Sequence, residues 1–211
     1  MTLWDKLPTL IWLIMSQEIL SKLNTTHIEE ISSSRNEPEW LKNYRKSSLS
    51  VYDSLPIETS PLYNKYTDAK KMDPEKVSLS TNTAETVPAF LQKRLGELEN
   101  EICIIQIGTN IHRINLPDEL KSKGLVISSI SDAVQNNFEL VKKALEASNS
   151  SDDKFTALNN AAFNSGIFIH IPRNFILDKP IYFLTCLSED GHSTISRNII
   201  FADESSKSTL V

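Results

Sequence analysis

Cysteine is scarce in this sequence, and its distribution already excludes two classes of protein. The 211 residues contain 2 cysteines, Cys103 and Cys186, which lie far apart and form no CxxC pair. Disulfide-rich secreted domains and zinc modules place their cysteines in closely spaced pairs, so neither class is expected. The pattern favours a reduced, cytoplasmic protein in which Cys103, flanked by apolar residues in EICIIQI, is a buried small side chain.

Glycine and positive charge are also in short supply. The chain has 5 glycines and no GxxxxGK[ST] or GxGxxG motif, so we expect no phosphate-binding loop, and any ATP hydrolysis would belong to a partner. Lysine and arginine number 22 against 27 aspartates and glutamates, a net charge of -5. Without a basic excess the chain has no field to hold a polyanion, and nucleic acid is not expected as a partner.

A long hydrophobic run is absent as well. The run LIWLIM near the start is shorter than the roughly 20 apolar residues that a membrane-spanning helix requires, and it lacks the basic lead and the cleavage site of a signal peptide. We therefore expect no membrane association. Residues 1–27 are interpreted as an N-terminal extension that contains an amphipathic helix, and either Met1 or Met15 could be the natural start.

What the sequence does contain is a clear series of helix and strand patterns. The first predicted helix covers residues 37–55, with Asn36 as its N-cap, Pro56 ending it and the basic residues on a solvated surface. Helical spacing places one set of residues near a single face, namely Trp40, Tyr44, Ser48, Val51 and Leu55. The basic residues Lys42, Arg45 and Lys46 lie elsewhere around the helix. Helix capping and a buried Trp40 explain the cluster Glu37, Pro38 and Trp40 better than a binding role does.

The middle of the chain alternates between irregular and regular patterns. Residues 57–83 are predicted to be an irregular connector, and residues 85–99 a helix with Phe90, Leu91, Leu95 and Leu98 on one side. EICIIQI and NIHRINL flank Gly108 and predict a hairpin, and a third strand begins at Gly124. A further helix is predicted from Ser131, its N-cap, with Val134, Phe138, Val141 and Leu145 on its apolar face, before a polar break at residues 148–153.

The rhythm of hydrophobic residues changes at Ser165-Gly166. FTALNNAAF before this point has helical spacing, whereas GIFIHIP, PIYFLTCLS, RNIIFADE and SSKSTLV are short strand-like runs separated by polar turns. The spacing of these runs fits either a β-sandwich or the successive faces of a parallel β-solenoid. We interpret the change as a domain junction.

Four stretches together resemble the SufB/SufD family, the scaffold components of the SUF iron–sulfur cluster assembly machinery. They are EEISSSRNEPEWLKNYRKSSLSVYDSLPI, LPDELKSKGLVISSISDAV, DDKFTALNNAAFNSGIFIHIPRNFILDKPIYFL and RNIIFADESSKSTLV. The short lead and SLPIETSPL are more similar to SufD than to SufB. Each stretch alone would be weak, but their order along the chain matches the family.

The resemblance implies an α+β protein: an N-terminal helical and small mixed α/β region at residues 28–150, then the first coils of a right-handed parallel β-helix at residues 151–211. It implies a non-catalytic scaffold that works with a SufB-like paralogue and a SufC-like ABC ATPase on an iron–sulfur cluster. The family's cluster ligands and ATPase-docking region lie beyond these coils, which suggests a fragment. No catalytic, cofactor-binding or metal-binding residue is therefore assigned here, and no cofactor is expected on this segment.

Two other functions stay open at this point. A β-helix enzyme acting on polysaccharide would need paired acids, for which Asp178, Glu189, Asp190, Asp203 and Glu204 are available. A docking module would use the N-terminal helices, including residues 3–23. Among single residues, Cys186 is either buried or faces a β-helix interior, and the scattered His27, His112, His170 and His192 are expected to be structural or exposed, His170 pointing to solvent.

Overall fold

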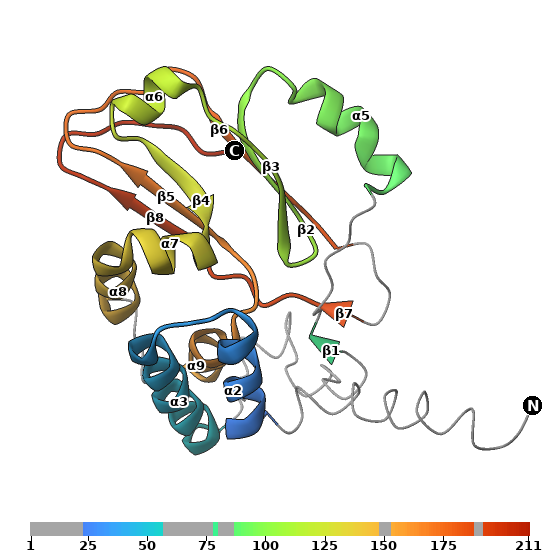
Figure 1. Ribbon diagram of the computed structural model, residues 1–211, viewed down its shortest axis with the longest axis vertical. Helices are drawn as coiled ribbons and strands as arrows, with labels where there is room; N and C mark the ends of the chain where they lie inside the picture. The colour runs from blue at the N-terminus through green and yellow to red at the C-terminus, as the bar shows by residue number, and fades with distance from the viewer. Residues whose placement is uncertain (1–22, 57–77, 80–86, 148–152, 188–191) are drawn as a thin grey trace, which may run out of the picture. The chain divides into compact units, whose positions relative to one another are not determined.

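The computed structural model describes residues 23–56, 78–79, 87–147, 153–187 and 192–211. The chain divides into two compact units, each assembled from separate stretches of sequence. The helical unit comprises Met1–Ser80, Asn149–Ala162 and Asp190–Ser193, and the sheet unit comprises the remaining residues. Figure 1 shows the elements of both units.

Three helices pack together in the helical unit. They are α2 (Thr25–Ser34), α3 (Glu39–Ser54) and α9 (Lys154–Ala162), and α3 packs against both of the others. The Asn24 side chain caps α2 by accepting a hydrogen bond from the His27 backbone N–H at 3.2 Å. The two-residue strands β1 (Ser78–Leu79) and β7 (His192–Ser193) pair in parallel in the same unit.

Helix α9 begins with a side-chain cap that the sequence analysis did not identify. The Asp153 carboxylate accepts hydrogen bonds from the backbone N–H groups of Phe155 and Thr156, at 3.2 and 2.8 Å, and from the Thr156 hydroxyl. The Thr156 hydroxyl is the main reason why the pKa of Asp153 lies below its usual value, and the backbone donors add to the effect.

Helix α3 differs from its prediction at its start and on its buried face. It begins at Glu39 after Pro38, with no side-chain cap, and Asn36 instead lies in the turn from α2 with φ +52°. Its buried residues are Leu41, Arg45, Ser48 and Leu49, whereas Trp40 is only partly buried. The predictions for Asn36 and Trp40 were therefore wrong, because α3 contacts α2 and α9 together and this turns its buried strip by one position.

Two three-stranded sheets form the centre of the sheet unit. In the first, β2 (Ile102–Ile107) pairs antiparallel with β3 (Asn110–Asn115) and parallel with β6 (Ile181–Cys186). In the second, β5 (Ile167–Ile171) pairs antiparallel with β4 (Val126–Ser129) and parallel with β8 (Ile199–Ala202). The predicted hairpin around Gly108 is confirmed as β2 and β3, and the predicted third strand as β4.

Both sheets contribute to one apolar core, and helices cover their other faces. The core contains ten buried side chains from the strands and their connections: Ile102, Ile104, Leu116, Leu125, Ile127, Ile167, Ile169, Ile171, Leu177 and Ile181. Helix α5 (Ala89–Glu97) packs Leu91 against the opposite face of β2. The second sheet contacts α7 (Ile130–Asn136) and α8 (Phe138–Ala147), and α6 (Asp118–Ser122) precedes β4.

Two helices of the sheet unit also depart from prediction. Phe90 of α5 is 73% exposed, so only part of the predicted face is buried. The helix predicted from Ser131 is two helices that meet at Asn137, and its cap is Ser129, whose hydroxyl accepts from the Asp132 N–H at 2.9 Å. Phe138 is the first residue of the second of these helices, and it is 45% exposed rather than part of the buried face.

The mixed α and β composition predicted from the sequence is confirmed, and the parallel β-helix stays a prediction. So do the domain boundaries at residues 27 and 150. The N-terminal amphipathic helix and most of the connector at residues 57–83 lie outside the described residues. Among the helices that are described, none has the length and apolar character needed to cross a membrane.

Candidate functional site

The most regular feature of the sheet unit is a seam between two parallel segments of chain. We call residues 165–183 the inner segment and residues 196–211 the outer segment. Ser165 pairs with Ser196, Ile169 with Ile200 and Ile176 with Lys207, all in parallel at an offset of 31 residues. The offset between paired residues is smaller at the end of the seam, where Ile181 pairs with Leu210.

Alternating apolar residues place one row of side chains across this seam. Paired residues of neighbouring strands share a face, so Ile127, Ile169 and Ile200 form a continuous row on the core side. Ile127 and Ile169 are buried, but Ile200 is 50% exposed. The row of core side chains therefore continues to β8, where the described residues do not cover Ile200 completely.

Polar side chains close the seam where the strands begin. The Asn164 side-chain oxygen accepts from the Ile195 N–H at 2.8 Å, and the Asn198 oxygen accepts from the Ile167 N–H at 3.1 Å. The hydroxyls of Ser165 and Ser196 lie 2.8 Å apart. These bonds satisfy backbone groups that would otherwise be unpaired between the segments, which fixes the register of one segment on the other.

Gly166 allows the two segments to approach this closely. It has φ +139°, and a Cβ at this position would lie 2.0 Å from the carbonyl oxygen of Arg197. A side chain is therefore excluded both by the backbone conformation and by the neighbouring segment. The glycine at the predicted change of rhythm is required by contact between the segments.

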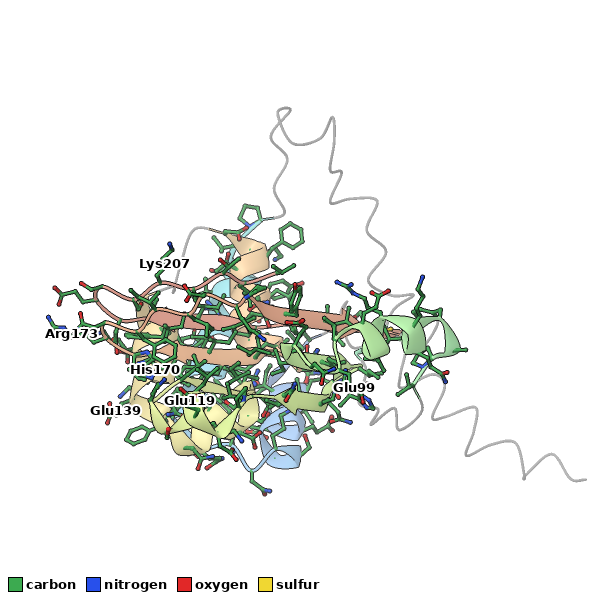
Figure 2. The ribbon with its side chains drawn as sticks, turned by 90° about the horizontal axis from the view of Figure 1, so that it is seen from above. Glu99, Glu119, Glu139, His170, Arg173 and Lys207 are labelled. Atoms are coloured by element: carbon green, nitrogen blue, oxygen red, sulfur yellow. The ribbon has the colours of Figure 1, made fainter. Side chains whose placement is uncertain are left out.

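Charged side chains link the far end of the same strands. His170 Nε2 lies 2.9 Å from Asp203 Oδ2, and the Arg173 guanidinium forms an ion pair with Glu204. The His170 ring also meets the Phe201 ring edge-on, with centroids 5.9 Å apart. Figure 2 shows His170, Arg173 and Lys207 at one end of the sheet unit. His170 is thus a structural residue of the seam, which is one of the two roles expected for it, and it does not point freely to solvent.

Strand β8 is the last strand of the second sheet in the described part of the chain. Arg197 and Asp203 donate their N–H groups to Ser165 and Ile171 of the inner segment, both at 2.9 Å. Because backbone groups alternate in direction along a strand, those of the even-numbered residues Ile200 and Ala202 point the other way. No strand in the described part of the chain pairs on that side. We call the β8 backbone on this side, with the Ile200 side chain, the outer edge.

The helical unit contains a buried ion pair between Glu37, which precedes α3, and Arg45 of α3. The side chain of Arg45 is 0% exposed, donates to both carboxylate oxygens of Glu37 at 2.7 Å, and donates to the Ala161 carbonyl of α9 at 3.0 Å. Nearby, burial and then the charge of Arg45 lower the pKa of Arg35. The sequence analysis placed Arg45 on a solvated surface, which was wrong; helical spacing alone gives no sign of a buried arginine.

The cysteines predicted to be structural lie on the α5 side of the first sheet. Cys103 is fully buried, and its thiol lies 3.7 Å from the Leu98 carbonyl oxygen. Cys186 is partly buried and packs against the same cluster of side chains. Cys103 pairs with Tyr182, four positions before Cys186, so the two thiols are roughly 13 Å apart along the sheet and form no disulfide. Cys186 does not contribute to the main core.

The other weighed residues are dispersed over the molecule. His112 and Asp178 are exposed, His27 lies in α2, and Glu189 and Asp190 lie outside the described residues, as does the side chain of His192. Asp203 and Glu204 are engaged by His170 and Arg173. Within the described ranges, no group of three His, Cys, Asp or Glu side chains converges in a way that could hold a metal ion.

Sequence reasoning missed the seam contacts, although the sequence carried a signal for them. SGIFIHI and SRNIIFA repeat a serine followed by a strand, starting at Ser165 and Ser196. An alignment of the chain with itself at this offset would have predicted the parallel pairing. The ion pair of Arg45 had no equivalent signal.

The chain is similar to known proteins of one family. The family model described as the SufBD protein N-terminal region matches residues 17–183. The chain is 28% identical over 193 residues to an iron–sulfur cluster assembly SufBD family protein of Staphylococcus aureus (strain USA300), and 29% identical over the same length to one of Staphylococcus saprophyticus. Both alignments cover 84% of this chain and 40% of the relative, so the chain spans well under half the length of these relatives. The chain belongs to the SufBD family, and the matched part is that family's N-terminal region.

Proposed function

We propose that this protein is a non-catalytic scaffold subunit of the SUF iron–sulfur cluster assembly machinery, of the SufD-like type. The observation that carries the proposal is the family match over residues 17–183, supported by relatives whose names specify iron–sulfur cluster assembly. The cluster is here the cargo of the complex. The partners are a SufB-like paralogue and a SufC-like ABC ATPase, and the place of action is the cytoplasm.

The contacts of the seam support a structural role over catalysis. The groups capable of acid–base chemistry at its charged end are held in pairs, His170 with Asp203 and Arg173 with Glu204. The amides and hydroxyls at its other end bond the backbone or one another. This arrangement fixes the register of the strands, as a rigid assembly platform requires, and leaves no pair of carboxylates facing a common point in the seam.

The parallel offset of 31 residues supports a β-helix as the architecture of this platform. In a parallel β-helix each coil stacks on the preceding one at a constant period, and each coil buries the apolar row of its neighbour. The inner and outer segments have this relation over three pairing sites. We propose that they are successive coils, and that cluster ligation and ATPase docking fall to other parts of the complex.

The proposal is tested by purifying the protein from its own cell. A tag is placed on the chromosomal gene, and the purified complex is analysed by quantitative mass spectrometry against an untagged strain. We expect an ABC-type ATPase and a second SufBD-family protein to be enriched together. A protein that purifies without either of them at near-native abundance would refute the scaffold assignment.

A second arm tests the role in cluster assembly. Deletion of the gene should lower the activity of a cluster-dependent dehydratase while leaving its protein level unchanged, and the wild-type gene should restore it. Restoration by a variant destabilised in the seam should be weaker in proportion to the loss of folded protein. An unchanged dehydratase activity in the deletion strain would count against the proposal.

A further inference from the structure

Parallel pairing extends from each sheet in one direction, and each sheet ends on its opposite side in an antiparallel strand. β2 pairs parallel with β6 and antiparallel with β3, and β5 pairs parallel with β8 and antiparallel with β4. The outer edge of β8 therefore lies on the side of the second sheet opposite to β4. β3 and β4 follow one another in the chain and are joined through α6 (Figure 1). We call residues 110–129, which contain these three elements, the cap segment.

The cap segment closes its end of the apolar core. Leu116 before α6 and Leu125 after it are 7% and 2% exposed and belong to the core shared by both sheets, and Leu120 of α6 packs against that core. β3 and β4 also contact each other, although they belong to different sheets. A single continuous stretch thus spans both sheets on the side where, within the described residues, no parallel strand is added.

Strand β3 is interrupted by a β-bulge. Two consecutive residues of β2, Ile105 and Gln106, pair with Arg113 and Ile111 of β3. The register therefore skips His112, which is exposed, and leaves three paired residues of β3 on one side of it and two on the other. A bulge bends its strand and increases its twist, and natural proteins use bulges to keep edge strands from pairing with other chains.

Strand β4 and helix α6 carry other features that protect an edge. β4 has four residues, and Ser129 at its end caps α7, so any pairing alongside it is limited to a short stretch. α6 and the residue that follows it present four exposed charged side chains, held in two ion pairs: Asp118, Glu119, Lys121 and Lys123. Short edge strands and charged side chains both disfavour pairing with another chain.

We propose that the cap segment ends the stack of strands on this side, and that the bulge at His112 keeps a second copy of this chain from pairing with β3. A strand that pairs with β3 would have to follow its backbone groups in an unbroken ladder. The bulge limits each regular stretch of β3 to three residues or fewer, so few hydrogen bonds would offset the entropy lost on ordering the new strand. This inference goes beyond the proposed function, because it concerns strand pairing and not cluster assembly.

Deletion of His112 tests the role of the bulge. Without His112, Ile111 and Arg113 become adjacent and face opposite sides of the sheet. Their partners on β2 are also adjacent, so all five residue pairs between β2 and β3 are retained. The variant should therefore fold with a regular β3 and should self-associate.

Sedimentation velocity of the 211-residue chain measures this association. At about 100 μM, a concentration suited to a small interface, the average mass of the deletion variant should rise to as much as about twice that of the wild type. The matched control is His112→Ala, which keeps the extra residue of the bulge and should behave as the wild type does.

Hydrogen exchange locates the association. In the deletion variant, the peptide covering residues 110–115 should exchange more slowly at high than at low protein concentration, whereas the peptide covering β8 should behave as in the wild type. Residues 110–115 of the wild type and of His112→Ala should show no such dependence on concentration. Thermal unfolding of all three proteins shows whether each is folded.

Several results would overturn the proposal. They are a deletion variant that associates no more than the wild type, a His112→Ala variant that associates as the deletion variant does, and a wild-type chain whose residues 110–115 become protected as concentration rises. A deletion variant that does not fold would also overturn it, because the hairpin itself would then require the bulge. None of these results bears on whether the paralogue and the ATPase copurify, so the proposed function stands or falls separately.

Discussion

Replacement of Gly166 by alanine should destabilise the seam more than a single methyl group would suggest. The added Cβ would lie 2.0 Å from the Arg197 carbonyl oxygen and 2.6 Å from its carbon, and both atoms are backbone. Such contacts in proteins are essentially never shorter than 3.0 Å, so the outer segment must retreat by about 1 Å. The N–H of Arg197, which donates to the Ser165 carbonyl at 2.9 Å, would then lose its hydrogen bond.

The magnitude follows from two separate effects. Alanine at φ +139° costs about 1–3 kcal/mol in backbone strain. Loss of the Arg197 bond and of the bond between the Ser165 and Ser196 hydroxyls adds about 1–3 kcal/mol in total. We therefore expect a loss of about 4 kcal/mol in the free energy of unfolding, which lowers the Tm of a chain of this size by roughly 8–16 °C.

Thermal and urea unfolding followed by circular dichroism measure the effect. The matched control is Gly96→Ala, because Gly96 lies in helix α5 with nothing within 4 Å of an added Cβ, and alanine should raise stability there by up to about 1 kcal/mol. If Gly166→Ala unfolds at the same temperature as the wild type, the close approach of the two segments is refuted.

Three further predictions concern the helical unit and the two thiols. Arg45→Ala should lower the free energy of unfolding, measured by urea denaturation, by about 3–5 kcal/mol, because it leaves the Glu37 carboxylate buried without its partner. A loss below about 1 kcal/mol would show that the ion pair is exposed to solvent. Asp153→Ala should cost about 0.5–2 kcal/mol at pH 7, because it removes the cap of α9. The pKa of Asp153 is lower in the folded protein than in the unfolded chain, so the contribution of its carboxylate to stability is complete above the unfolded pKa near 3.9. That contribution is lost as pH falls through the folded pKa. The free energies of unfolding of wild type and variant should therefore converge in acid, and parallel curves would contradict this. Ellman's reagent should modify Cys186 in the native protein and Cys103 only after unfolding, and equal rates would refute the burial of Cys103.

Local sequence patterns predicted where helices and strands form better than they predicted which side chains are buried. Alternating residues around Gly108 specified a hairpin, and Gly124 was correctly placed before a strand, because turn chemistry and strand alternation act over a few residues. The same reasoning placed Arg45 in solvent and Phe90 in the core, and both assignments were wrong. Helical spacing alone does not decide which side of a helix is buried, and the buried face of α3 was decided by its contacts with both α2 and α9.

In the candidate site too, local sequence predicted the change of structure but not the contacts between distant residues. Ser165, Gly166 and the strand that follows were recognised as a change of structure, and the family resemblance was sufficient to predict the membership that the family match then showed. The partner of Gly166 was not predictable from local sequence, since the atom it must avoid belongs to Arg197. The pairing of His170 with Asp203 likewise depends on a register that only the stacked segments define.

The sequence by itself determined the mixed α and β content, the order of helices and strands and the family, because periodicity, turn residues and ordered motifs are properties of neighbouring residues. Only the tertiary structure decided which segments pair in parallel, which charges are buried and which strands are neighbours in the second sheet. These depend on contacts between residues far apart in the chain, where packing and backbone pairing outweigh the local preferences of single residues.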